Sequence, residues 1–368
     1  MFLSDTQLAP IYALRQTLHG LPELSMHETC TMETLKSFLR THTTCTLHEQ
    51  DGWFFACRDI SPDLPTLAFR ADTDAIPCAA TGKPFHGCGH DGHAAALAGL
   101  AYLTESQKDS LRCNLLFLFQ PAEETGEGAK KCCSVMRDQS VSMICGCHTV
   151  PGFPHGTVLL RNDVFACASR GMILRFSGRQ SHAAYPETGC SPADAMAALV
   201  GQLDTLTRET EAAGRGTVLT TVVGMQLGGR NFGVSPGEGE LCLTVRAHYE
   251  ADLEQLTDRI AASAQTLCDP SGIGVDISFV DVFPDTVNAP DRVSSLRTLL
   301  TEHGIPHMTL SQPMRWSEDF GHYCRIFPGV FFGIGTGEAA PALHTDSFAF
   351  DDTLLPRILQ VWLAMIGL

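Results

Sequence analysis

A short segment of the chain, His86-Gly-Cys-Gly-His-Asp-Gly-His93, concentrates the residue types that bind transition metals. It lies in a glycine-rich turn ahead of an alanine-rich run that begins at Ala94 and looks like the start of a helix. Cys88 and His90 are two positions apart, so both side chains can point to one side of an extended turn. Structural zinc sites usually present paired cysteines or histidines at regular spacing and are closed. One cysteine among three histidines therefore favours an open catalytic site, with His93 as a structural residue.

Two adjacent glutamates form the second element. Glu123 and Glu124 follow the apolar run Leu115–Phe119 and the dipeptide Gln120-Pro121. At the end of a buried strand, burial and mutual repulsion both disfavour the charged forms of neighbouring carboxylates. A metal bound by one glutamate relieves this penalty and leaves the other as a base with a raised pKa. The alternative is a solvated acidic loop, and the preceding apolar strand counts against it.

Four further polar residues each follow an apolar run: Asp72, Asp74, His148 and His344. Taken singly, each is more typical of a polar loop than of a metal site. Ligands in open α/β sheets bind at the carboxyl ends of the strands, however. Together with the first two elements, these four side chains would converge on one edge of a sheet.

The elements that position these residues follow from the hydrophobic pattern. Continuous apolar runs separated by helical patterns indicate a buried, largely parallel sheet with helices on both faces, so the fold class is α/β. The runs that we assign to strands of this sheet are residues 66–70, 115–119, 143–147 and 330–334.

The middle of the chain has a different pattern. We expect strands at about 170–179, 217–227, 240–249 and 275–279, a helix capped by Ser191 with Pro192 at its first position, and a helix over 253–267. The order strand-helix-strand-strand-helix-strand is that of a ferredoxin-like α+β unit. We therefore predict a metal-binding domain of residues 1–167 and 283–368, interrupted by a second domain of residues 168–282.

Composition limits the possible partners and compartment. The formal net charge of -16 argues against a nucleic-acid surface, which needs clustered lysine and arginine. The N-terminus has no secretory signal pattern, and no apolar run approaches the length of a membrane span, so no membrane partner is expected. The 15 cysteines have no framework spacing and indicate buried, reduced thiols in a cytoplasmic protein.

Several motifs occur in the order found in a known family: His19–Leu24, Arg70–Pro77, His86–His93, Phe119–Glu124, His148, Ser317–Phe320 and His344. Over nearly its whole length the chain resembles the aminoacylase/carboxypeptidase family of binuclear metallohydrolases. The resemblance is strongest to the branch of N-acyl-amino-acid amidohydrolases, which includes hippurate hydrolases and the plant hydrolases of indole-acetyl amino acids. It implies a catalytic domain with a zinc-peptidase-like mixed sheet, and a ferredoxin-like lid that forms the contact of a homodimer.

The resemblance also implies a role for each matching residue. Two divalent ions (zinc, manganese, cobalt or nickel) would be held by Cys88, His90, Glu124, His148 and His344. Glu123 would be the general base, and Asp72 and Asp74 would orient the ligands. His182, which the residues alone indicate only as a turn histidine, matches a lid histidine that approaches the active site of the partner subunit and stabilises the oxyanion. The implied reaction is hydrolysis of an N-acyl amino acid or a similar small amide by a metal-activated water.

The chain departs from the family pattern at two places. The loop between Pro77 and His86 is shorter than in this branch, and Gly233 stands where the lid often has an asparagine. Asn231, two residues before Gly233, is a candidate to take over that asparagine's part in substrate binding, and Arg246 is a second candidate for substrate binding. Two other functions fit the same residues as alternatives to the hydrolysis of an N-acyl amino acid. One is a dipeptidase or specialised deacetylase with the same metal core, and the other is a non-catalytic metal- or partner-binding protein. The presence of a base beside a ligand counts against the second, because binding alone needs no base.

Overall fold

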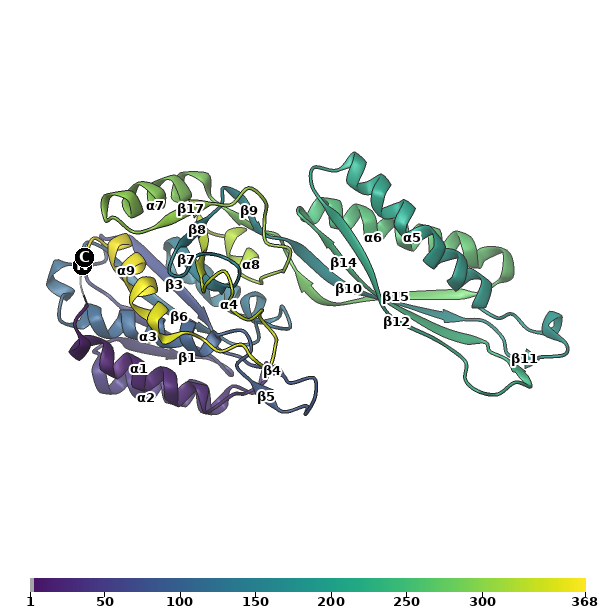
Figure 1. Ribbon diagram of the computed structural model, residues 1–368, viewed down its shortest axis with the longest axis horizontal. Helices are drawn as coiled ribbons and strands as arrows, with labels where there is room; N and C mark the ends of the chain where they lie inside the picture. The colour runs from purple at the N-terminus through teal and green to yellow at the C-terminus, as the bar shows by residue number, and fades with distance from the viewer. Residues whose placement is uncertain (1–2) are drawn as a thin grey trace. The chain divides into compact units, whose positions relative to one another are not determined.

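The computed structural model describes residues 3–368, which divide into two compact units (Figure 1). The first unit contains the chain up to Phe165 together with Thr286–Pro313 and Asp319–Leu368. The second contains Ala166–Asp285 and Met314–Glu318. The boundaries expected from the sequence differ from these by two or three residues, and they did not anticipate that Met314–Glu318 belongs to the second unit.

A mixed sheet of eight strands forms the centre of the first unit, in the order β1-β2-β6-β3-β7-β18-β8-β17. The four strands predicted from apolar runs are neighbours in it and run parallel to one another. Antiparallel pairs lie towards both edges, at β1–β2, β2–β6 and β8–β18. The strands are β1 (Thr46–Glu49), β2 (Phe54–Arg58), β3 (Thr66–Asp72), β6 (Asn114–Gln120), β7 (Val141–Val150), β8 (Val158–Leu160), β17 (His307–Thr309) and β18 (Gly329–Gly335).

Helices cover both faces of this sheet, as two neighbouring residues of β3 show. On one face, Phe69 contacts Trp362 of α9 (Leu355–Met365), with ring centroids 5.8 Å apart; on the other face lies α8 (Gly321–Cys324). Arg70, the next residue, points to the other face, where Gln120 accepts hydrogen bonds from its Nε and from Tyr323 of α8. The mixed sheet between two helical layers confirms the α/β class.

The helices of the first unit are α1 (Asp5–His19), α2 (Thr29–His42), α3 (His90–Glu105), α4 (Gly128–Met136), α7 (Pro290–Glu302), α8 (Gly321–Cys324) and α9 (Leu355–Met365). α3 packs on β3 and β6, and α1, α2 and α9 contact its other sides (Figure 1). The unit also contains short 3₁₀ turns at Lys108–Ser110, Arg137–Gln139 and Asp352–Leu354, and the strand pairs β4 (Ile76–Pro77) with β5 (Pro84–Phe85) and β9 (Asp163–Ala166) with β16 (Thr286–Asn288).

The second unit is a four-stranded antiparallel sheet, in the order β12-β14-β10-β15, with two helices on one face. Its elements are β10 (Ala168–Ser177), β11 (Ser181–His182), α5 (Ala193–Ala213), β12 (Val218–Leu227), β13 (Val234–Ser235), β14 (Glu238–Ala247), α6 (Glu250–Cys268) and β15 (Gly274–Phe283), with 3₁₀ turns at Pro186–Thr188 and Asp269–Ser271. Alternate residues of the strands, such as Leu241, Leu243 and Val245, are buried together with Leu253 and Leu256 of α6. This order and topology confirm the ferredoxin-like prediction.

Two helix starts differ from the prediction. α3 begins at His90 rather than near Ala94, because Gly89 takes a left-handed conformation (φ 89°) that ends the preceding turn. Consequently His90 and His93 lie on the first turn of a helix instead of in a loop. α5 begins at Ala193, with Pro192 at the N-cap position where Ser191 was expected. None of the helices within residues 3–368 is long and apolar enough to cross a membrane.

Candidate metal centre

The candidate ligands of the first unit gather at the edge where the parallel strands end. Asp72 ends β3, Glu123 and Glu124 follow β6, His148 lies near the end of β7, and His90 begins α3. Their ligand atoms form overlapping groups within 4.8 Å: Cys88 with Glu124 and His344; His90 with Glu123 and Glu124; and Asp72 with His90, His93 and His148. The convergence that spacing alone could only suggest is therefore present in the fold.

His90 presents one ring nitrogen to the protein and the other to the cluster. Nδ1 lies 3.0 Å from the carbonyl oxygen of Asp74 and 3.1 Å from its Oδ1, so this nitrogen carries a proton and donates. Nε2 is buried and has no hydrogen-bond partner. Although burial lowers it, the charges of Asp72 and Asp74 raise the pKa of His90 to about 10. A ligand histidine held by a carboxylate at its second nitrogen is the arrangement that metal sites use to orient imidazole.

His148 is oriented in the same way by a different acceptor. Its Nδ1 lies 2.7 Å from the carbonyl oxygen of Thr149 and donates to it. Its Nε2 faces the cluster, 3.3 Å from Sγ of Cys88. Burial, followed by the neighbouring His93, holds the pKa of His148 well below its usual range, so the ring is neutral as a ligand must be.

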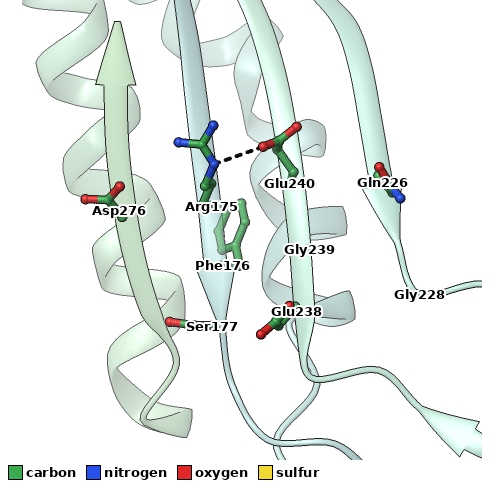
Figure 2. A pocket seen from close by; sticks show the side chains of 9 residues that line it. All are labelled: Arg175, Phe176, Ser177, Gln226, Gly228, Glu238, Gly239, Glu240 and Asp276. Carbon is green, nitrogen blue, oxygen red and sulfur yellow. Dashed lines mark hydrogen bonds and ion pairs between the residues drawn. The ribbon is translucent and has the colours of Figure 1, made fainter.

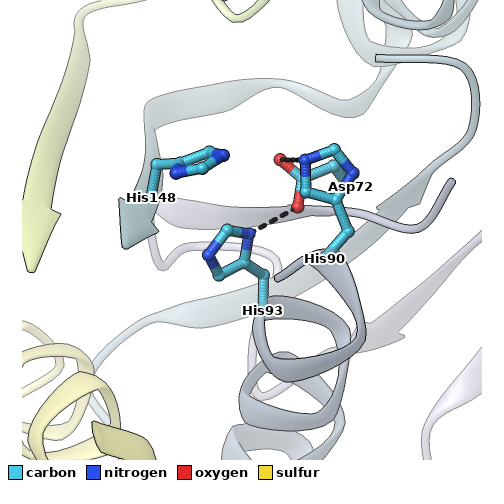
Figure 3. Close-up of side chains that lie close together, drawn as sticks. All are labelled: Asp72, His90, His93 and His148. Carbon is cyan, nitrogen blue, oxygen red and sulfur yellow. Dashed lines mark hydrogen bonds and ion pairs between the residues drawn. The ribbon is translucent and has the colours of Figure 1, made fainter. Parts of the chain in front are cut away.

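His93 has both ring nitrogens occupied by protein groups. Nδ1 lies 2.8 Å from Oδ1 of Asp72, and Nε2 accepts the backbone N–H of Thr149 at 3.2 Å. Because an imidazole nitrogen that accepts a hydrogen bond has no lone pair left for a metal, His93 acts as a brace for Asp72. Figure 3 shows Asp72 between His90 and His93, with His148 opposite.

The thiol and the last histidine are held together by the backbone. The N–H of His344 donates to the carbonyl oxygen of Gly87 at 2.8 Å, which brings this residue next to Cys88. His344 adopts a left-handed conformation (φ 64°) and its side chain is 53% exposed, so this side of the cluster is open. Burial, and then the charges of Glu124 and Glu123, raise the pKa of the Cys88 thiol well above its usual value. A metal ion would reverse this effect, because a coordinating thiol loses its proton.

A sharp turn after β6 places Glu123 and Glu124 beside His90. Ala122, just after β6, has φ 51°, and its carbonyl oxygen accepts the N–H of Gly128 at 3.0 Å. The backbone N–H of Glu124 donates to Oδ2 of Asp74 at 3.0 Å. Oε1 of Glu124 is buried without a hydrogen-bond partner, 3.8 Å from Nε2 of His90 and 3.5 Å from Nε2 of His344.

The donor set fits divalent metal ions. Two buried atoms that lack hydrogen-bond partners, Nε2 of His90 and Oε1 of Glu124, face each other across the cluster. Leaving such atoms unpaired costs free energy, which coordination of a cation would recover. The sulfur, nitrogen and oxygen donors suit zinc and its neighbours in the transition series. Cys88 lies near both His148 and the Glu124–His344 pair, so its thiol would be one of the groups that hold the ions.

The remaining candidate residues, which the family resemblance assigns to a lid, lie in the second unit. His182 is exposed on β11, with its ring 5.8 Å from that of Tyr185. Asn231 lines a hollow of about 730 Å³, and its Oδ1 accepts the N–H of Gly233 at 3.2 Å. Arg246 donates to Oγ of Ser317 at 2.8 Å. Roles for His182, Asn231 and Arg246 in substrate binding remain predictions.

A second hollow in this unit, of about 560 Å³, opens where β10, β12, β14 and β15 lie side by side (Figure 2). Arg175 and Glu240 form an ion pair there at 3.0 Å, and Asp276 and Glu238 also line it.

Several residues that support the site had no role in the sequence-based interpretation. Arg70 is fully buried and contacts Asp72, Gln120 and Asp319, although its motif was visible only as part of a family pattern. Ser25 donates to Asp74 and Glu28 accepts from Ala122. Nothing in the spacing of these residues marked them, because all of these partners except Asp72 lie about 50 to 250 residues away along the chain.

Comparison with known proteins identifies the family of this chain. Residues 68–367 match the family described as peptidase family M20/M25/M40. An N-acetyldiaminopimelate deacetylase of Bacillus licheniformis is 27% identical over 89% of this chain and 90% of that protein. An N-acetyl-L-cysteine deacetylase of Bacillus subtilis is 28% identical over 94% of this chain and 84% of that protein.

Solved structures share the fold of both units. A putative aminohydrolase from methicillin-resistant Staphylococcus aureus superposes with a TM-score of 0.88 at 23% identity, over 98% of this chain and 96% of that one. A dinuclear metal-binding peptidase of the M20 family from Bacillus subtilis gives a TM-score of 0.83 at 22% identity, over 99% of both chains.

Proposed function

Because the chain belongs to peptidase family M20/M25/M40, we propose that it is a metal-dependent amidohydrolase that cleaves the amide bond of an N-acyl amino acid or a similar small amide. The observation that carries this proposal is the buried cluster in which Nε2 of His90 and Oε1 of Glu124 lack hydrogen-bond partners beside the thiol of Cys88. A second glutamate adjoins the ligand glutamate, as a hydrolase needs and a binding protein does not.

Five residues would hold two divalent ions: Cys88, His90, Glu124, His148 and His344. When bound, such ions lower the pKa of water and polarise a carbonyl oxygen. Glu123 would accept a proton from the attacking water and pass it to the leaving amine. Asp74 and the Thr149 carbonyl would keep His90 and His148 in the tautomers that present Nε2 to the metals.

Replacing the base separates catalysis from metal binding. Glu123→Gln should lower kcat by roughly 100-fold to 10,000-fold while leaving the metal content at two ions per chain. Glu124→Gln is the matched variant, since it should reduce the metal content as well. Near-normal activity of Glu123→Gln would show that the base assignment is wrong.

The acyl group is best identified with a panel of substrates. Acetyl amino acids come first, because two relatives are named as deacetylases of N-acetyldiaminopimelate and N-acetyl-L-cysteine. Benzoyl and long-chain acyl amino acids test the wider branch, and dipeptides test the peptidase alternative. If the protein with its full metal content cleaves none of them, the non-catalytic binding function becomes the better explanation.

We also propose that the second unit is a lid that forms a homodimer. β12 is an edge strand, and it exposes 42% of Val222, 62% of Val223 and 49% of Met225. A long apolar edge favours pairing with another strand. Val223→Lys should therefore shift the protein from dimer to monomer in sedimentation velocity, whereas an unchanged mass would exclude this edge as the interface.

In such a dimer, His182 would act in the site of the other subunit. Glu123→Gln and His182→Ala proteins, each inactive alone, should then complement one another after mixing and exchange. About a quarter of wild-type activity is expected, because half of the dimers become mixed and each of these has one complete site. Absence of any recovery would place His182 in its own subunit's site or outside both.

The cysteines favour the cytoplasm. All 15 lie in the described part of the chain, and all are free thiols. A reducing compartment keeps such thiols from pairing.

A further inference from the structure

We propose that Ser25 and Glu28 are positioning residues that hold the Glu123–Glu124 turn against the metal centre, an inference that rests on the hydrolytic function proposed above. Both belong to the segment between α1 and α2, about 100 residues before the turn in sequence. Ser25 bonds to Asp74 and Glu28 to the backbone of Ala122, neither of which is among the five proposed metal ligands.

Glu28 holds the turn at its most constrained residue. Its Oε1 accepts the backbone N–H of Ala122 at 2.7 Å. Ala122 is fully buried and has φ 51°, a conformation that side chains other than glycine disfavour. Without Glu28 this N–H would be buried and unpaired, and the left-handed conformation would lose the contact that favours it. The next residue in the chain is the candidate base.

Ser25 acts on the other end of the turn through Asp74. Its Oγ donates to Oδ2 of Asp74 at 2.7 Å, and the same oxygen accepts the backbone N–H of Glu124 at 3.0 Å. Oδ1 of Asp74 meets Nδ1 of His90. Ser25 therefore fixes the rotamer of the carboxylate that connects the Glu124 backbone with the imidazole of His90.

The segment that carries these two residues is itself held in place. The carboxylate of Glu23 accepts the backbone N–H groups of Cys30 and Thr31 at 3.0 and 2.8 Å, at the start of α2. The carbonyl oxygen of Glu23 accepts the N–H of Ala75, next to Asp74, at 2.8 Å. Ser25 and Glu28 thus project from a closed turn that is tied to both β3 and α2.

Catalysis depends on this arrangement because the base must meet its proton at hydrogen-bond distance. A displacement of about 1 Å at such a group can lower the rate by roughly 100-fold. A residue that only stabilised the fold would lower the amount of folded enzyme but would leave kcat per metal-loaded site unchanged.

The test measures kcat, KM, metal content and amide exchange for a set of full-length variants. Glu28→Ala should lower kcat per metal-loaded site by 10-fold to 100-fold with little change in KM, and Glu28→Gln, which keeps an acceptor for the Ala122 N–H, should restore most of it. Ser25→Ala, which removes a single hydroxyl, provides the same test if Glu28→Ala does not fold. Glu33→Ala is the control, because Glu33 is an exposed glutamate of helix α2, which directly follows this segment.

Hydrogen exchange separates this inference from the proposed activity. In Glu28→Ala the amides of residues 122–124 should exchange at least 10-fold faster than in wild type and in Glu33→Ala. If wild type cleaves no substrate, the proposed function fails, and the exchange result alone decides whether Glu28 holds the turn. Unchanged exchange, or a kcat per loaded site within twofold of wild type for both Glu28→Ala and Ser25→Ala, would overturn the inference.

Discussion

Arg70 is the residue whose loss should damage the first unit most, because it is a fully buried cation between two fully buried carboxylates. Its Nη1 donates to Oδ2 of Asp72 at 2.7 Å and its Nη2 to Oδ1 of Asp319 at 2.8 Å. All three side chains are inaccessible to solvent. Arg70→Met keeps much of the side-chain volume but removes the guanidinium, whose permanent positive charge contacts both carboxylates.

The expected cost follows from what each carboxylate retains. Asp319 keeps hydrogen bonds from Nε2 of Gln120 and the N–H of Ala129, and Asp72 keeps its contact with Nδ1 of His93. Neutral donors do not replace a cation in a buried pair, so we expect a loss of about 3–5 kcal/mol in the free energy of unfolding. Adding Asp319→Asn to Arg70→Met removes one of the two carboxylate charges that have lost the guanidinium, while the carboxamide can still accept from Ala129. The double variant should therefore recover about 1–2 kcal/mol relative to Arg70→Met.

Urea unfolding of the metal-free protein, followed by circular dichroism, measures these differences. Arg40→Met is the control, because Arg40 pairs with Glu49 at the surface with 53% of its side chain exposed, and it should cost less than about 1 kcal/mol. A loss below about 1 kcal/mol for Arg70→Met would refute the reasoning, since a buried pair would then behave like an exposed one. A double variant that is less stable than Arg70→Met would show that Asp319 does not depend on Arg70 for its charge.

Three further predictions follow from other parts of the structure. Burial and the neighbouring Asp74 raise the pKa of Glu28 to about 7, so its contribution to stability is present below about pH 4.5 and is lost as the pH rises through 7. In urea titrations of the metal-free protein, the free energy of unfolding of Glu28→Gln should therefore rise by about 3 kcal/mol relative to wild type between pH 4 and pH 8, and parallel curves for the two proteins would contradict this. A Cβ on Gly92 would lie 2.2 Å from the ring of Phe350, so Gly92→Ala should cost about 1–3 kcal/mol, whereas Gly201→Ala, with no atom within 4 Å, should add about 0.5–1 kcal/mol to the free energy of unfolding in the same assay. Zinc added after chelation should raise the Tm of wild type by several degrees. Calorimetry should show a much smaller rise for Cys88→Ala, because Cys88 is one of the five proposed ligands and its sulfur lies near the others.

The sequence was sufficient to predict the central part of the fold, because burial on both faces leaves a readable pattern. The strands ending near Asp72, Gln120 and His148 are continuous apolar runs, and they became the parallel centre of the sheet. The start of α3 was predicted late, since a helix that begins with His90, Asp91, Gly92 and His93 has no apolar period in its first turn. The polar side chains of this first turn are buried because they pack into the candidate metal site, and a pattern of apolar residues cannot predict the burial of polar ones.

Contacts between segments that are distant in sequence could not be predicted. Residue types and spacing placed Glu123 and Glu124 after a strand, but the conformation of Ala122 depends on a carboxylate that lies in the segment before α2. In the same way, Met314–Glu318 belongs to the second unit through contacts such as that between Ser317 and Arg246. Such contacts have no local signal, because each side chain is compatible with many loops until its partner is known.

The histidines of the cluster illustrate how identical residues acquire different roles. His90 and His148 each donate from Nδ1 to an oxygen of the protein, which leaves Nε2 as the atom that faces the cluster. His93 also donates from Nδ1, to Asp72, but its Nε2 already accepts the N–H of Thr149. The backbone N–H of Thr149 is what distinguishes His93 from the other two histidines, and Thr149 directly follows His148 in β7. The strand that positions His148 as a candidate ligand therefore also occupies the nitrogen through which His93 could coordinate a metal. The selection of ligands is therefore a property of β7 and α3 together, and not of the histidine-rich segment alone.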